Sequence, residues 1–72
     1  MNPAPTPLSG RIEFWDARAE RGRVVARGRL WHFGVTDWVG PAPPRVGAFV
    51  TFVPVVAAFT RHAGFIRLEP PG

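Results

Sequence analysis

Apolar and polar positions alternate in short runs along this chain. In residues 11–15, Ile12 and Phe14 fall on one face and Arg11 and Glu13 on the other, which is the period of a half-buried β-strand. Four further strands are predicted at residues 23–27, 30–35, 48–57 and 65–68. The one stretch with helical preference, residues 16–20, is too short for more than a turn. The pattern therefore predicts an all-β domain.

Glycine and proline mark the connections between these strands. Gly28, between Arg27 and Arg29, predicts a tight hairpin. Residues 36–46 are rich in proline and glycine and predict a loop, and residues 61–64 predict a turn. Pro54 cannot donate a hydrogen bond to a ladder, so its strand is expected to lie at an edge or a bulge.

The 72 residues leave room for a single core. We expect a flexible proline-rich arm at residues 1–9, a β-barrel domain at 10–68 and a short tail at 69–72. The first nine residues lack the basic start and apolar centre of a signal peptide. The most apolar run, residues 46–59, is too short to span a bilayer, and Pro54 interrupts it.

Charge narrows the choice of partner. All nine basic residues are arginine, and against five acids they give a formal net charge of +4. This balance favours a polyanionic partner, nucleic acid ahead of an anionic membrane or an acidic protein. The absence of cysteine excludes disulfides and thiolate metal sites and fits a cytoplasmic protein.

Catalytic chemistry has no support in the sequence. There is no nucleophile elbow and no phosphate-binding loop, and the five carboxylates show no pairing. A metal site would have to combine His32 and His62 with carboxylates from scattered loops. We therefore expect no enzyme activity, no cofactor and no metal.

Aromatic side chains and arginines interleave in the first half of the chain. Trp31-His32-Phe33 lies in one predicted strand and Phe14-Trp15 in another, with Arg21-Gly22-Arg23 between them. Rings stack on nucleic-acid bases with about 1–3 kcal/mol each, and guanidinium groups neutralise phosphates. Because Phe14 and Trp15 are adjacent, simple alternation would point one ring inward and the other outward.

In this order the segments resemble the cold-shock domain, an OB-fold barrel that binds single-stranded RNA and DNA. The family's first strand reads roughly G-x-V-K-W-F-N, and residues 10–16 keep that spacing with the two aromatics exchanged. Its third strand ends in V-H-F, which Trp31-His32-Phe33 resembles. Residues 46–52 and 63–66 are similar to its fourth and fifth strands, so the resemblance spans residues 10–68. It implies a small five-stranded antiparallel OB-fold-like barrel of cold-shock type.

The chain departs from the family in its first RNA-binding motif. Where the family has K-G-F-G-F-I, residues 21–26 read R-G-R-V-V-A, so both phenylalanine rings are missing. In the second motif, V-F-V-H-F, Leu30 replaces the first phenylalanine. About half of the family's stacking platform is therefore absent.

We expect the protein to bind single-stranded RNA or DNA with little sequence preference. The resemblance implies stacking by Trp15, His32 and Phe33; Phe14 could stack or belong to the core, and Trp38 could serve as a loop aromatic or cover a barrel end. The residues expected to hold phosphates are Arg21, Arg23, Arg27, Arg29 and Arg61. The residues expected in the core are Phe49, Val50, Phe52, Val55, Phe59 and Phe65, with Trp31 pointing inward.

The alternative is a small β-barrel that has become a protein-protein interaction module and has lost most nucleic-acid binding. The apolar strand around Pro54 would then offer an exposed edge to a protein partner or to a second copy in a homodimer. We expect no membrane among the partners.

Overall fold

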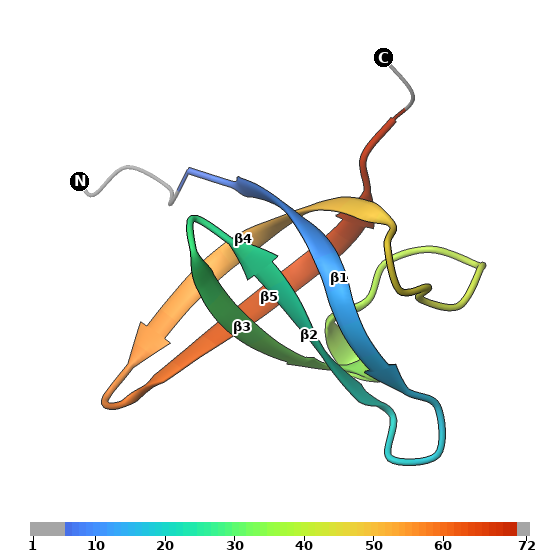
Figure 1. Ribbon diagram of the computed structural model, residues 1–72, viewed down its shortest axis with the longest axis horizontal. Helices are drawn as coiled ribbons and strands as arrows, with labels where there is room; N and C mark the ends of the chain where they lie inside the picture. Colours follow the sequence, from blue (N-terminus) through green and yellow to red (C-terminus); the bar gives the residue numbers. More distant parts are fainter. Residues whose placement is uncertain (1–5, 71–72) are drawn as a thin grey trace.

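The computed structural model describes residues 6–70, which form a closed barrel with the strand order β1-β2-β3-β5-β4 (Figure 1). Its elements are β1 (Leu8–Asp16), β2 (Arg21–Ala26), β3 (Arg29–Gly34), the 3-10 helix η1 (Val35–Asp37), β4 (Phe49–Ala57) and β5 (Thr60–Leu68). All strand pairings are antiparallel except that of β3 with β5. The predicted fold class, a small OB-like barrel, is confirmed. Within residues 6–70, no helix is long and apolar enough to cross a membrane.

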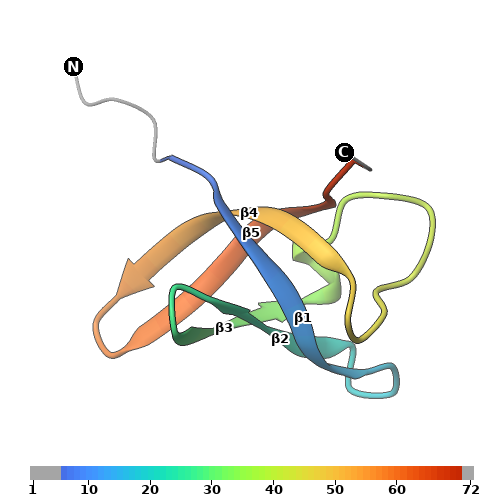
Figure 2. The same cartoon turned by 45° about the horizontal axis from the view of Figure 1, so that its top comes forward.

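The topology gives the barrel two different ends. The β2–β3 and β4–β5 turns lie, apart from each other, on the side of the barrel where β1 begins, which we call the hairpin end (Figures 1 and 2). The β1–β2 turn, η1 and the start of β4 lie at the opposite end. The two ends therefore carry different parts of the sequence.

The core is built from inward-facing residues of all five strands. Trp31 is buried as expected, and its indole N–H donates a hydrogen bond to the carbonyl oxygen of Ala26 at 3.1 Å. Val50 and Phe52 are also confirmed as core residues. The full set of buried apolar residues is Ile12, Val24, Ala26, Trp31, Phe33, Val50, Phe52, Ala63 and Ile66.

Four residues predicted for the core are exposed instead: Phe49, Val55, Phe59 and Phe65. The ladder between β1 and β4 ends at the pair Leu8 and Phe52, so the β4–β5 hairpin continues beyond the barrel wall. Val55 and Phe59 lie on that extension and have no opposite layer to pack against. At Phe65 the register of β4 with β5 shifts, and its positive φ of 48° turns the ring outward.

Strand boundaries also differ from the prediction, most at the starts of β1 and β5. Strand β1 starts at Leu8, because Leu8 and Ser9 pair with β4, although both were assigned to the arm. The predicted turn at residues 61–64 is wrong: β5 already begins at Thr60, and Ala58, with a φ of 51°, lies in the turn before it. Residues 1–5 of the predicted arm lie outside the described residues.

The hairpin predicted around Gly28 is confirmed. Arg27 and Gly28 both have positive φ angles, 56° and 71°, between the paired residues Ala26 and Arg29. Two positive φ angles are the geometry of the tight turn that suits the twist of a hairpin. This turn fixes the register of β2 with β3, on which the candidate site depends.

Candidate nucleic-acid interface

A bulge in β1 determines which aromatic ring faces outward. Ile12 pairs with Val24 and Phe14 pairs with Arg23, so Glu13 is one residue more than β2 can match. The extra residue reverses the alternation: Ile12 is fully buried, yet Phe14 is 38% exposed and Trp15 packs against the core. The expectation that Phe14 shares the face of Ile12 and that Trp15 is the exposed ring is therefore wrong.

Trp15 and Phe33 stack on each other inside the barrel wall. Their ring centroids are 5.6 Å apart and their planes differ by 7°. Gly22 is the partner of both residues in the ladders, and a Cβ there would lie 2.8 Å from Cζ of Phe33. The two rings meet because the residue between them has no side chain.

This stack corrects the role expected for Phe33. Its side chain is only 2% exposed, so its ring has no free face for a base. Trp15 is half-buried, with one face on Phe33. Both rings support the sheet from below rather than forming its outer surface.

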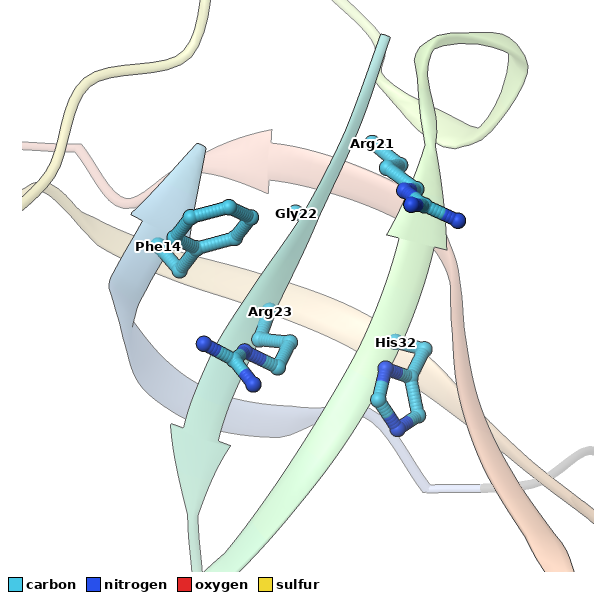
Figure 3. Close-up of a pocket in the computed structure, with 5 residues that line it drawn as sticks. All are labelled: Phe14, Arg21, Gly22, Arg23 and His32. Carbon is cyan, nitrogen blue, oxygen red and sulfur yellow. The ribbon is translucent and has the colours of Figure 1, made fainter. Parts of the chain in front are cut away.

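On the outer surface, Phe14, Arg23 and His32 form one row across β1, β2 and β3 (Figure 3). Arg23 is the ladder partner of Phe14 on one side and of His32 on the other. Together with Arg21 and Gly22 they line a pocket of about 320 Å³. The pocket thus combines a phenyl ring, an imidazole and two guanidinium groups on one side of the barrel.

Arg23 is the central residue of this row. Its guanidinium carbon lies 4.7 Å from the centroid of the Phe14 ring, a cation–π contact. Its Nε lies 3.3 Å from Oε2 of Glu13, close enough for an ion pair. The contact does not have hydrogen-bond geometry, so the Glu13 carboxylate faces this buried N–H through charge.

Arg21 and His32 have open surroundings. Arg21 pairs with Gly34, which has no side chain to cover it, and both Arg21 and His32 are exposed. The neighbour of His32 on β5 is His62, whose Nε2 donates to Oδ2 of Asp37 at 2.8 Å. The same oxygen accepts the backbone N–H of Gly34 at 2.9 Å, so His62 is engaged with η1.

The remaining predicted site residues lie elsewhere. Arg27 and Arg29 flank the β2–β3 turn, and Arg61 lies on β5 opposite Val56, all at the hairpin end. Trp38 packs against the core, and its indole N–H donates to the carbonyl oxygen of Ala42 at 2.7 Å. This packing agrees with a cover over the barrel, and the role of Trp38 as a loop aromatic stays a prediction.

Three residues of the site escaped the sequence analysis as functional positions. Glu13 contacts Arg23 only because of the bulge, for which the sequence has no signal. Gly22 lies beneath the pocket and allows the Trp15–Phe33 stack. Arg11 is exposed and pairs with Val25, whose other partner is Leu30, so it extends the same outer face. The alternation of β1 was the signal that could have identified Arg11.

The arrangement suits a ligand with planar rings and anionic groups. Rings and guanidinium planes can stack on bases, and arginine N–H groups can donate to phosphate oxygens. Among the described residues no group of three or more His, Cys, Asp or Glu could hold a metal ion. No protein-family model, no curated protein and no solved structure matches this chain.

Proposed function

We propose that the outer face of β1, β2 and β3 binds single-stranded RNA or DNA with little sequence preference. The observation that carries this proposal is Arg23, whose guanidinium lies in a pocket with Phe14 and His32 beside the partly exposed Glu13 carboxylate. A phosphate or a base carbonyl entering the pocket would accept hydrogen bonds from this guanidinium and compete with Glu13 for its charge.

Stacking would use the planar groups of the central row. Arg23 already covers the Phe14 ring, so a base can extend the stack on the guanidinium plane or on the ring's free portion. The His32 imidazole is the next planar group, one strand further along. Neighbouring strands lie about 4.8 Å apart, so the row offers successive bases a continuous surface.

Phosphate binding would depend on arginines around this row. Arg21 lies in the pocket, and Arg11 lies on the same face toward the start of β1. Asp16, the partner of Arg21 in β1, accepts the backbone N–H groups of Arg18 and Ala19 with its Oδ1. The Asp16 carboxylate is therefore engaged with the backbone of its own turn, which leaves the neighbouring Arg21 guanidinium available to a phosphate.

We also propose that the domain is a divergent member of the cold-shock family, located in the cytoplasm. The strand order and the outward position of His32 support this kinship. In OB folds the face of strands 2 and 3 is a common site for oligonucleotides, and it is the face on which Arg23 and His32 lie. The lack of cysteine is the reason for the cytoplasm.

The test is a fluorescence anisotropy titration of a labelled oligothymidylate with the wild type, Arg23→Ala and Arg67→Ala. Arg67 is an exposed arginine on β5, paired with Thr51, so its removal changes net charge without touching the pocket. We expect Arg23→Ala to weaken binding at least tenfold, or about 1.4 kcal/mol. Equal losses for both variants, or no binding by the wild type, would reject the proposal.

A protein-interaction module is the second candidate. Exposed apolar side chains outside the pocket, among them Phe49, Phe65 and Leu68, favour it. Such a module would give no anisotropy change with the oligonucleotide, and Phe65→Ser would remove its binding to a partner protein. The pocket around Arg23 has no role in this candidate, which is why we place it second.

A further inference from the structure

Arginines lie on both hairpins at the hairpin end of the barrel. Arg27 and Arg29 flank the β2–β3 turn, and Arg61 lies beside the β4–β5 turn; the two turns project separately from the same side of the molecule (Figures 1 and 2). Among the described residues, Glu13, Asp16, Glu20 and Asp37 lie in the middle of β1 or toward the opposite end. Glu69 accepts a hydrogen bond from the Ser9 hydroxyl at 3.3 Å, near the start of β1. The two turns are therefore matched to an anionic surface.

The same end presents an apolar tip. Residues 55–59 read Val-Val-Ala-Ala-Phe, and every one of them is exposed. Phe59 is fully exposed and Val56 is 69% exposed. Monomeric proteins rarely expose contiguous apolar surface without a partner for it. The tip is also convex, because the β4–β5 hairpin projects beyond the barrel (Figure 1).

The edge of this hairpin is poorly suited to a second copy of the chain. Beyond Phe52, β4 has no ladder with β1, so an edge is present. Pro54 lies in that edge and has no N–H to donate to another strand, which is a common protection against edge pairing. A convex tip also offers little area to a flat, self-complementary interface.

We propose that the hairpin end docks on an anionic phospholipid bilayer. The side chains of Phe59 and Val56 enter the boundary between headgroups and acyl chains, where an apolar body is favoured. Arg27, Arg29 and Arg61 contact lipid phosphates at the level of the headgroups. This proposal departs from the expectation of no membrane among the partners, because the exposure of Val56 and Phe59 appears only in the structure.

This proposal is independent of the nucleic-acid face. Phe14, Arg23 and His32 lie on the side of the barrel, whereas the lipid contact uses the two turns at one end. No residue serves in both sites. When a variant changes one of the two sites, unchanged binding at the other site shows that the variant is folded.

The test is sedimentation with vesicles of phosphatidylcholine, with and without phosphatidylserine. We expect the wild type to sediment with the phosphatidylserine vesicles only. Phe59→Ser should weaken this binding about tenfold, which is the loss expected for one partly inserted phenylalanine. Replacing Arg27 and Arg29 by glutamine should weaken it about fivefold for each charge.

The matched control is Phe65→Ser, which removes an equally large exposed ring from β5 outside the β4–β5 tip. It should sediment like the wild type, and Phe59→Ser should keep wild-type affinity for oligothymidylate. Equal sedimentation of the two serine variants, or no binding of the wild type to anionic vesicles, would overturn the proposal. A dimer in analytical ultracentrifugation that Phe59→Ser dissociates would also overturn it, because the tip would then serve a second copy.

Discussion

Trp15 stacks on Phe33 through the space left by Gly22, with 5.6 Å between the ring centroids. The pair explains why, of the two adjacent aromatic residues in β1, Trp15 packs against the core and Phe14 faces outward. Trp15 is drawn toward the core by Phe33, and Phe14 then remains on the outer face with Arg23. The buried Trp15–Phe33 stack thus helps to place Phe14 on the outer face, where Arg23 covers its ring.

Gly22→Ala should destabilise the fold. A Cβ at this position would lie 2.4 Å from the carbonyl oxygen of Phe14 and 2.8 Å from the Phe33 ring. Overpacking of this kind costs about 1–3 kcal/mol. The measurement is urea unfolding followed by tryptophan fluorescence. Gly34→Ala is the control, since its Cβ would meet nothing closer than 3.7 Å, and its stability should stay near that of the wild type.

Phe14→Ala should weaken binding to oligothymidylate and leave the fold nearly intact. The ring is 38% exposed, so its removal costs little packing, and the lost cation–π contact is worth about 0.5–1 kcal/mol. Loss of one stacking ring should cost about 1–3 kcal/mol of binding free energy, which raises Kd about 5-fold to 150-fold. Isothermal titration gives the affinity and thermal melting gives the stability. If Phe65→Ala, which removes an exposed ring on β5, weakened binding equally, the site would be misplaced.

Glu13→Gln should increase affinity for nucleic acid. The carboxylate lies 3.3 Å from Nε of Arg23 and competes with an incoming phosphate for that charge. The pair is partly exposed and therefore weak, so we expect a gain of only a few fold. Glu69→Gln removes the same charge far from the pocket, and a comparable gain there would mean that net charge alone is responsible.

The salt dependence of binding should identify the arginines that hold phosphates. For a single strand, log K against log salt concentration falls by about 0.7 for each phosphate neutralised. Arg21→Gln should therefore reduce the slope by about that amount, since Arg21 lines the pocket. The slope is measured by anisotropy at several salt concentrations. An unchanged slope for Arg21→Gln together with a reduced one for Arg67→Gln would contradict the assignment.

The strands could be anticipated because alternation and turn chemistry are local signals, whereas the OB-like barrel was implied by the family resemblance. The tight turn at Arg27-Gly28 and the inward position of Trp31 follow from such signals, and both are confirmed. The central row of the candidate site could be anticipated in part, since Arg23 and His32 were both selected. Their direct pairing follows from the register that the turn imposes.

The remainder depends on features that arise only when strands pair. The bulge at Glu13 turns Phe14 to the outer face and Trp15 toward the core, and no residue type in β1 indicates a bulge there. Phe33 is the exception: it lies two residues after the inward-facing Trp31, so the alternation of β3 already places it on the core side, against the stacking role implied by the family resemblance. Phe59 and Val55 look like core residues in sequence, and only the length of the β4–β5 hairpin relative to its contact with β1 exposes them.

The most direct test of the central claim is amide chemical-shift mapping by NMR during titration with unlabelled oligothymidylate. We predict that the largest shifts fall on Phe14, Arg21, Arg23 and His32 across three neighbouring strands. Residues 55–59 at the β4–β5 tip should stay unchanged and serve as the internal reference. Shifts confined to that tip, or no shifts at all at low salt, would contradict the assignment of this face to nucleic acid.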